Sequence, residues 1–250
     1  MECIETSSGA KLSYTLTLNN STSRYLVILV HGTMATKDLL FLPSLSEKLP
    51  YNNLRFDFEG NGQSTGKFSI GGFKSEVDQI KTVVDWARNS GYIPLALIGH
   101  SKGANEVLMY SVVHGDVPLT VSIAGRVDMG VLPKVLDPVL DKVETEGQAT
   151  LSLGSKEFLV EKTGLQERKK LNMNKILSAQ KSWVCVIHGE NDEITNPQDA
   201  FQMKTILGQN CFDFQIVPEA DHMFKDVDLA IHIENFFKKS VPLLELMRVI

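Results

Sequence analysis

Residues 95–104 constrain the fold of this 250-residue chain more than any other stretch. They consist of an apolar run, Leu-Ala-Leu-Ile, then Gly-His-Ser-Lys-Gly, and then the beginning of a helical pattern. This order predicts a buried strand that turns sharply into a helix, with the serine at the turn. Gly99 and Gly103 leave room where the strand and the helix cross, because a Cβ at either position would collide with that crossing.

Apolar runs recur along the chain and alternate with segments of helical spacing. Residues 2–6 and 11–18 alternate polar and apolar side chains, which predicts an opening β-hairpin. The alternation of strands and helices predicts an α/β fold, in which a mostly parallel central sheet is flanked by helices. Further strands are expected at 25–30, 53–58, 95–98, 117–124, 183–187 and 212–217, and helices at 35–50, 73–90, 105–114, 197–207 and 226–239.

The segment 125–180 interrupts this alternation. Its apolar residues form two amphipathic stripes, at 132–143 and at 157–173, and the second stripe is more charged. Helical spacing in both stripes predicts a small helical cap inserted into the α/β core. The core is then built from residues 1–124 and 181–250.

Composition excludes several classes of protein. The chain is 43% hydrophobic and 22% charged, and its net charge of −5 without a basic stripe argues against nucleic acid as a partner. No apolar run reaches the length of a membrane span, and the first residues lack the pattern of a secretory signal. Three widely spaced cysteines predict reduced, mostly buried thiols, so a cytoplasmic location is expected. Oligomeric state is not predicted.

Ser101 is the predicted nucleophile. A serine hydroxyl is a weak nucleophile until an imidazole accepts its proton, and a carboxylate must hold that imidazole in the right tautomer. In serine enzymes with this strand–turn–helix arrangement, the acid and then the histidine follow the nucleophile along the chain. Asp192 lies in a loop after the predicted strand 183–187, and His222 lies between the last predicted strand and helix. Both loops are expected at the carboxyl edge of the sheet, where ligands bind in open α/β folds.

Other titratable residues in these regions have simpler interpretations. Glu190 and Glu193 share the loop of the predicted acid and are expected to be solvated charges. His232 lies inside a predicted helix, where a surface or core role is expected, and Asp221 is expected to form a turn or a helix cap. The six histidines form no pair with metal-ligand spacing, so neither a metal nor another cofactor is predicted.

Attack on a carbonyl carbon places negative charge on its oxygen, which then needs fixed hydrogen-bond donors. The backbone N–H of Lys102, directly after the nucleophile, is one predicted donor of this oxyanion hole, and the N–H of Thr33 is the other. The Lys102 side chain has two interpretations. Its ammonium could attract an anionic substrate group, but the favoured interpretation is that the long stem carries the charge into solvent.

Three motifs resemble the α/β-hydrolase superfamily, and the resemblance extends over nearly the whole chain. Leu-Val-His-Gly at 29–32 is similar to the family's strand-to-oxyanion motif, and Gly-His-Ser-Lys-Gly at 99–103 matches its nucleophile elbow. Asp-Phe-Glu-Gly-Asn-Gly-Gln-Ser at 57–64 is similar to a loop that shapes the site wall and is usually not catalytic. Asp192 and His222 fall at the positions of the triad acid and base.

Two shorter stretches narrow the resemblance. Ala-Gly-Arg-Val-Asp at 124–128 and Glu-Lys-Thr-Gly at 161–164, together with His-Ser-Lys-Gly at the elbow, resemble a plant and protist branch near cinnamoyl and feruloyl esterases. The branch has a second glycine where this chain has Ala104. Asn196 stands where a proline is common after the acid, so the resemblance does not predict the shape of that loop.

The resemblance and the predicted triad together imply a serine hydrolase that cleaves a small or medium carboxylic ester through an acyl-enzyme. The expected partner is the small-molecule ester substrate. Two alternatives remain at this point. A ligand-binding sensor can retain an intact triad on the same scaffold, and an acyl or thioester transferase forms the same acyl-enzyme but passes it to a different acceptor.

Overall fold

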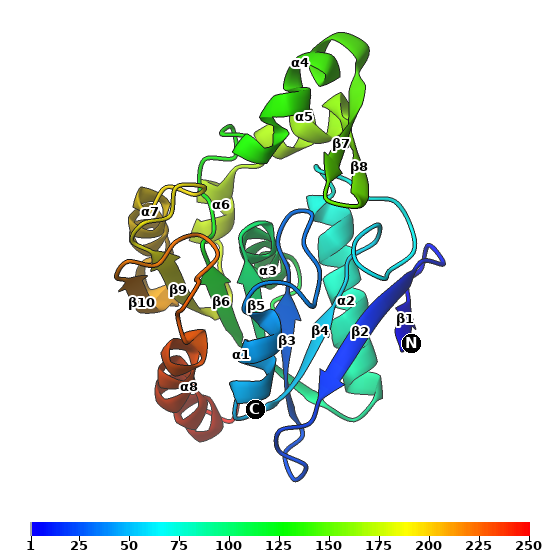
Figure 1. The fold of residues 1–250 in the computed structure, drawn as a ribbon. Helices are drawn as coiled ribbons and strands as arrows, with labels where there is room; N and C mark the ends of the chain where they lie inside the picture. The colour runs from blue at the N-terminus through cyan, green and yellow to red at the C-terminus, as the bar shows by residue number, and fades with distance from the viewer. Residues whose placement is uncertain (1) are drawn as a thin grey trace.

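The structure, a computed structural model, describes residues 2–250. Its centre is an eight-stranded sheet with the order β1-β2-β4-β3-β5-β6-β9-β10 (Figure 1). The strands are β1 (Cys3–Glu5), β2 (Lys11–Thr17), β3 (Tyr25–Val30), β4 (Asn52–Phe56), β5 (Ile93–His100), β6 (Leu119–Ile123), β9 (Trp183–Gly189) and β10 (Cys211–Val217).

Most of this sheet is parallel. β1 and β2 form the predicted antiparallel hairpin, and β2 pairs antiparallel with β4. All pairs from β4 to β10 are parallel, with β5 between β3 and β6. The predicted α/β architecture is therefore confirmed. Because parallel strands end at one edge, the loops after β3, β5, β9 and β10 open at the same side of the sheet.

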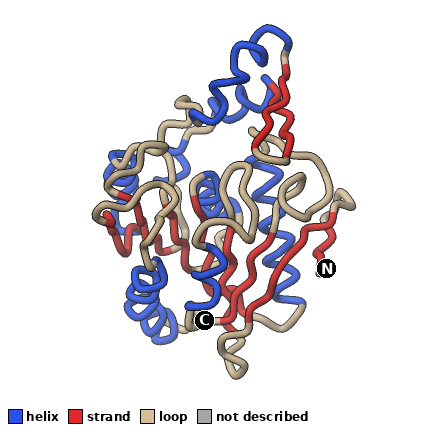
Figure 2. The backbone as a smooth tube through the Cα atoms, in the orientation of Figure 1, coloured by secondary structure: helices blue, strands red, loops and turns tan. Residues whose placement is uncertain are grey.

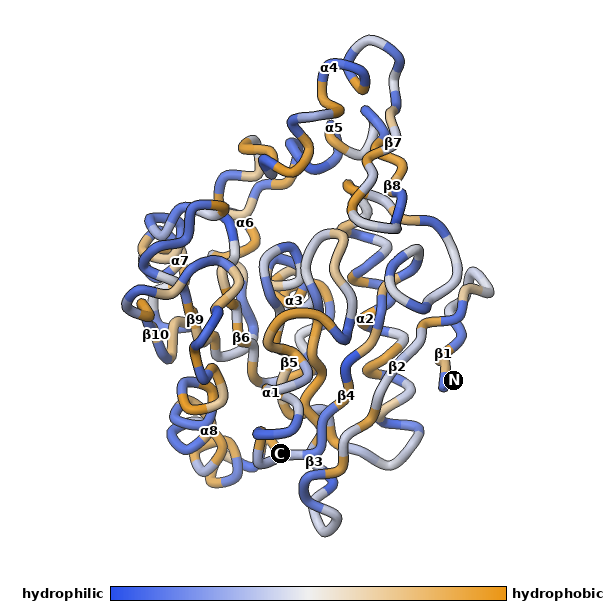
Figure 3. Tube along the Cα trace, viewed as in Figure 1, coloured by the Kyte–Doolittle hydropathy of each residue, from blue (hydrophilic) through white to orange (hydrophobic). Residues whose placement is uncertain are grey.

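Helices cover both faces of the sheet, and β3 shows why its sequence is continuously apolar. Leu26 and Ile28 pack on the side of α2 (Phe73–Asn89) and α3 (Lys102–Val113). Val27 and Leu29 point to the opposite face, toward α1 (Leu42–Lys48) and α8 (Leu229–Leu246). Figure 3 shows hydrophobic residues (orange) concentrated in the central strands. α6 (Met173–Ser178) and α7 (Gln198–Leu207) cover β9.

The segment predicted as a helical cap contains strands as well as helices (Figure 2). It includes a short 3₁₀ turn at Lys134–Leu136, α4 (Asp137–Glu146), β7 (Gln148–Leu153), β8 (Lys156–Glu161) and α5 (Lys162–Lys170). β7 and β8 form an antiparallel hairpin. The predicted helical stripe at 157–173 is therefore wrong over β8, where Phe158 and Val160 are buried between exposed neighbours with the period of a strand.

The inserted segment has a small apolar cluster of its own. Leu136, Val143 and Leu165 pack together with the hairpin and with Ile70 from the loop before α2. This cluster fixes the segment above the carboxyl edge of the sheet (Figure 1). The boundaries of the cap at 125 and 180 remain a prediction.

Two expectations from composition can be compared with the structure. No disulfide joins the three cysteines, all of which lie in the described part of the chain. Cys185 is buried, but Cys3 is exposed and Cys211 is half-buried, so the prediction of mostly buried thiols is wrong for Cys3. Among residues 2–250, no helix has the length and apolar character needed to cross a bilayer.

Candidate active site

The turn between β5 and α3 holds Ser101 in a strained backbone conformation. Its φ of 55° and ψ of −116° lie outside the regions that side chains other than glycine favour. A Cβ on Gly99 would lie 2.2 Å from the carbonyl oxygen of Gly103, and one on Gly103 would lie 2.5 Å from that of His31. Gly99 is therefore required by the close crossing of β5 and α3, as the sequence predicted, whereas Gly103 is required by the approach of α3 to the end of β3.

Ser101, His222 and Asp192 form one hydrogen-bonded chain. Ser101 Oγ lies 3.1 Å from His222 Nε2, and His222 Nδ1 lies 2.7 Å from Asp192 Oδ2. The three residues come from the loops after β5, β10 and β9, which end at the same edge of the sheet. Since Nδ1 donates to the carboxylate, Nε2 is left as the acceptor that faces the serine hydroxyl.

The loop after β9 keeps Asp192 ionised. Asp192 Oδ1 accepts hydrogen bonds from the backbone N–H of Ile194, at 2.9 Å, and of Thr195, at 2.7 Å. Burial alone would raise the pKa of Asp192, but hydrogen bonds from His188 and then His222 outweigh it and hold the pKa well below its usual range. A charged acceptor of this kind can orient an imidazole and stabilise its protonated form.

His188 and His100 are two buried histidines that support this chain and that the sequence analysis did not assign. His188 Nε2 lies 3.2 Å from Asp192 Oδ2 and 3.1 Å from the carbonyl oxygen of Thr195, so it donates to oxygens. His100 Nε2 lies 2.9 Å from the carbonyl oxygen of His222. Burial, and then the nearby His222, lower the pKa of His100 to about 3, so its ring is neutral. Each of these two histidines stands at the carboxyl end of a buried strand, β5 or β9, and this position in the sequence could have identified them.

The competing residues lie where the simpler interpretations put them. Glu190 and Glu193 are exposed. His232 lies on α8 and forms a hydrogen bond of 2.6 Å between its Nδ1 and Gln215 Oε1. Asp221 Oδ1 accepts the backbone N–H of Met223 at 3.0 Å and therefore forms a turn.

The loop after β3 brings Thr33 against the nucleophile. A Cβ on the preceding Gly32 would lie 3.0 Å from Ser101 Cβ, so the two loops are in contact. Thr33 and Lys102 both line the cavity in front of Ser101. Within residues 2–250, neither backbone N–H donates to another protein group, which leaves both donors available to a ligand.

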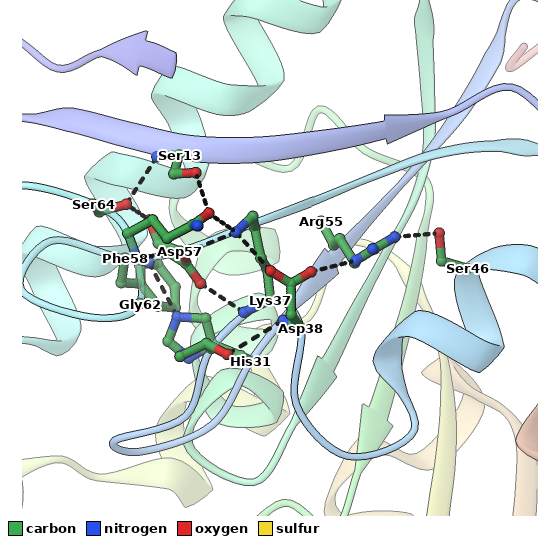
Figure 4. A network of polar contacts seen from close by, with 12 residues as sticks. Ser13, His31, Lys37, Asp38, Ser46, Arg55, Asp57, Phe58, Gly62 and Ser64 are labelled. Carbon is green, nitrogen blue, oxygen red and sulfur yellow. Dashed lines mark hydrogen bonds and ion pairs between the residues drawn. The ribbon is translucent and has the colours of Figure 1, made fainter. Parts of the chain in front are cut away.

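A buried polar network supports this loop from behind (Figure 4). His31 Nδ1 donates to the carbonyl oxygen of Gly32 at 2.8 Å, and His31 Nε2 accepts the backbone N–H of Phe58 at 3.1 Å. Asp57 accepts the backbone N–H of Lys37 at 2.6 Å and its Nζ at 3.2 Å, and both side chains are almost fully buried. The predicted wall loop at 57–64 is thus anchored to the segment that follows Thr33.

The side chain of Lys102 does not reach solvent, so the favoured prediction for it is wrong. Its Nζ forms an ion pair with Glu76 of α2 and lies 3.5 Å from Glu106 Oε1, and all three side chains are buried. Burial, and then repulsion by Glu76, raise the pKa of Glu106 well above its usual range. The negative charge of Glu76 therefore compensates the positive charge of Lys102. Only the backbone N–H of Lys102 is left as a free donor toward the cavity.

A cavity of about 280 Å³ opens in front of the hydrogen-bonded chain. Residues after β3, β5 and β10 form its floor, and the inserted segment supplies its opposite wall. Most of the lining is apolar, with two arginines among it. The lining consists of Thr33, Met34, Ser101, Lys102, Asn105, Ala124, Arg126, Pro133, Lys134, Val135, Leu153, Arg168, Ile194, Thr195, His222 and Met223.

Solved structures of similar shape come from several organisms. Est1E from Butyrivibrio proteoclasticus, with ferulic acid bound, matches 97% of this chain and 100% of its own with a TM-score of 0.76 and 15% identity. An esterase domain from Rhodothermus marinus covers 95% and 97% at 0.71 and 20% identity. Mouse alpha/beta hydrolase domain-containing protein 10 covers 95% and 98% at 0.69 and 18% identity. No protein-family model and no curated protein matches the chain by sequence.

These likenesses show the fold. The chain has the α/β-hydrolase fold, as its motifs implied, over nearly its full length. The narrower resemblance to a plant and protist branch remains a prediction, because the identities of 15–20% do not separate branches.

Replacing Asp57 by asparagine should destabilise the fold, because Lys37 would keep a buried charge without its buried counter-ion. We expect Asp57→Asn to lower the free energy of unfolding by about 3–5 kcal/mol, measured by urea denaturation. The control is Asp38→Asn, which removes a half-exposed partner of the same lysine and should cost about 1 kcal/mol or less. Equal losses in the two variants would contradict the role of the buried pair.

The raised pKa of Glu106 predicts a dependence of stability on pH. Folded protein keeps a proton on Glu106 that the unfolded chain releases near the ordinary pKa of 4.5. This group's contribution is therefore complete below that pH and is lost as the pH rises toward the raised pKa. Glu106→Gln should lose less stability than the wild type as the pH rises above about 5. The exposed Glu146→Gln is the control, and parallel wild-type and Glu106→Gln curves would refute the assignment.

Proposed function

We propose that the protein is a serine hydrolase that cleaves a small or medium carboxylic ester through an acyl-enzyme intermediate. The observation that carries this proposal is the hydrogen-bonded chain from Ser101 through His222 to Asp192 at the floor of a largely apolar cavity. The α/β-hydrolase fold supports a hydrolase, and the esterases among its structural neighbours favour an ester. Ferulic acid is bound in one of those neighbours, Est1E.

Acylation begins when Ser101 Oγ attacks the ester carbonyl carbon and His222 Nε2 accepts the hydroxyl proton. The ionised Asp192 stabilises the imidazolium that forms, since it already accepts the hydrogen bond from Nδ1. Collapse of the tetrahedral intermediate breaks the bond to the alcohol oxygen. His222 returns its proton to that oxygen, so a neutral alcohol leaves and the acyl group stays on Ser101.

Deacylation repeats these steps with water. His222 removes a proton from a water molecule, whose oxygen attacks the acyl carbon. The bond to Ser101 Oγ then breaks, and His222 returns the proton to the serine. The products are a carboxylic acid and the regenerated hydroxyl.

The charge on the carbonyl oxygen is held by two backbone donors in this proposal. The N–H of Lys102 lies at the first turn of α3, where the helix dipole also favours negative charge. The N–H of Thr33 comes from the loop that packs against Ser101. Loss of one such donor typically costs about 3–4 kcal/mol of transition-state stabilisation.

Substitution within the triad tests this function. Ser101→Ala should lower kcat for p-nitrophenyl butyrate by roughly 10⁴-fold or more, because no acyl-enzyme can form. Asp192→Asn should lower kcat by roughly 10³- to 10⁴-fold, since an amide no longer fixes the imidazole tautomer. Release of p-nitrophenol measures both.

Exposed residues of the same types provide the controls. Ser152→Ala and Glu193→Gln change a serine and a carboxylate without touching the cavity, and both should keep wild-type rates. Turnover by Ser101→Ala that equals the wild type, with both proteins folded by circular dichroism, would refute the proposed nucleophile.

A further inference from the structure

Two buried arginines face the cavity beside the proposed nucleophile. Arg126 follows β6 on the core side, and Arg168 lies on α5 of the inserted segment. Their exposed fractions are 7% and 5%. Burial of a charged group is costly unless the group is paired, so a carboxylate partner would be expected for each.

Neither arginine has such a partner. No carboxylate oxygen among residues 2–250 lies within 4.0 Å of either guanidinium. At longer range, Asp199, then Asp192 and Asp128 attract Arg126, and Asp128 attracts Arg168. Burial, and then repulsion by Arg126, lower the pKa of Arg168 to about 10, which still leaves it charged at neutral pH.

The hydrogen bonds of the two side chains leave donors unused. Arg126 Nη1 and Arg168 Nη2 both donate to the carbonyl oxygen of Val131, at 3.2 Å each. Arg126 Nη2 also donates to the carbonyl oxygen of Ile194 and, at 3.4 Å, to the hydroxyl of Thr195. The buried Nε of Arg168 has no partner within the described residues. Each guanidinium carries five N–H donors, so the pair offers more donors than the protein accepts.

Two lysines also line this cavity, and neither shares this property. Lys102 is neutralised by its ion pair with Glu76. Lys134 forms no ion pair among residues 2–250 either, but it is exposed, so water solvates its charge. The buried positive charge of the cavity that lacks an ion pair therefore belongs to Arg126 and Arg168, which two separate parts of the fold bring to one carbonyl oxygen.

We propose that Arg126 and Arg168 bind an anionic group on the substrate, a deduction that rests on the proposed ester hydrolysis. The substrate class is an ester with a carboxylate or phosphate remote from the scissile bond. Guanidinium forks match both anions in geometry, and an anion would supply the missing counter-charge. Met34, Leu153 and Met223 line the same cavity, so the part of the substrate between the ester and the anion is apolar.

Matched pairs of esters test this specificity. In the first pair, 4-acetoxybenzoate and its methyl ester differ only in a charge on the alcohol side. In the second, p-nitrophenyl hydrogen adipate and its methyl ester differ in a charge on the acyl side. The wild type should prefer the anionic member of at least one pair by roughly ten- to hundredfold in kcat/KM. Replacing 4-acetoxybenzoate by 4-acetoxyphenyl phosphate then separates a phosphate preference from a carboxylate preference.

Substitution of Arg168 assigns the preference to this pair of arginines. Arg168→Gln should remove most of it, because kcat/KM should fall much further for the anionic ester than for its neutral partner. Lys169→Gln is the matched control, because it removes an exposed charge from the next residue of α5 and should change neither ratio. Arg168→Lys, which keeps the charge but loses the fork, should give an intermediate preference.

The outcomes separate this deduction from the proposed function. Ester turnover that depends on Ser101 but shows no anionic preference in either pair would overturn the arginine site alone, even if Arg168→Gln did not fold. Equal effects of Arg168→Gln and Lys169→Gln would also overturn it. If no ester is hydrolysed, anion binding by the arginines is tested by the shift in Tm of the Ser101→Ala protein with 4-acetoxybenzoate and with its methyl ester. Stabilisation by the anion alone supports the site, and equal or absent stabilisation refutes it.

Discussion

The close crossing between β5 and α3 is the constraint on which the rest of the site depends. Gly99 lets β5 and α3 approach until their backbones nearly touch, Gly103 lets α3 approach the end of β3, and Ser101 is left at the turn with a positive φ. Such a strained residue persists only where its surroundings hold it in place. Here the neighbouring strands β3 and β6 do so, through contact with the loop at Gly32 and through a hydrogen bond from Ser101 N to Ile123 O of 2.8 Å.

The buried cations around the site fall into two groups. One group stabilises the structure of the site, and in our proposal the other sets its specificity. Lys37 is paired with Asp57, and Lys102 with Glu76, so both lysines stabilise loops and helices around the cavity without adding net charge to it. Arg126 and Arg168 donate only to uncharged acceptors, which are carbonyl oxygens and the hydroxyl of Thr195. An unpaired buried cation destabilises a fold. Its presence in a ligand cavity is explained when the counter-charge arrives with the ligand.

The sequence predicted the parts of the structure that follow from local patterns. Continuous apolar runs marked most of the parallel strands. Because Ser101, Asp192 and His222 each follow a predicted strand, they were expected at one edge of the sheet, and there the structure joins them by hydrogen bonds. The β7–β8 hairpin was missed, because short apolar spacings fit a helix and a strand almost equally well. The burial of the Lys102 side chain depends on a carboxylate of α2, which no local pattern reveals. The meeting of Arg126 and Arg168 depends in the same way on tertiary packing.

Covalent labelling with a fluorophosphonate tests most directly whether Ser101 is an activated nucleophile. The reagent forms a bond between its phosphorus and an activated serine oxygen and releases fluoride, so peptide mass spectrometry can locate the adduct. We predict a single phosphonyl group on Ser101 of the folded protein. Labelling should be much slower in a His222→Ala variant, which lacks the base. An unmodified Ser101 after prolonged exposure, or equal labelling rates with and without His222, would contradict the proposed catalytic chain.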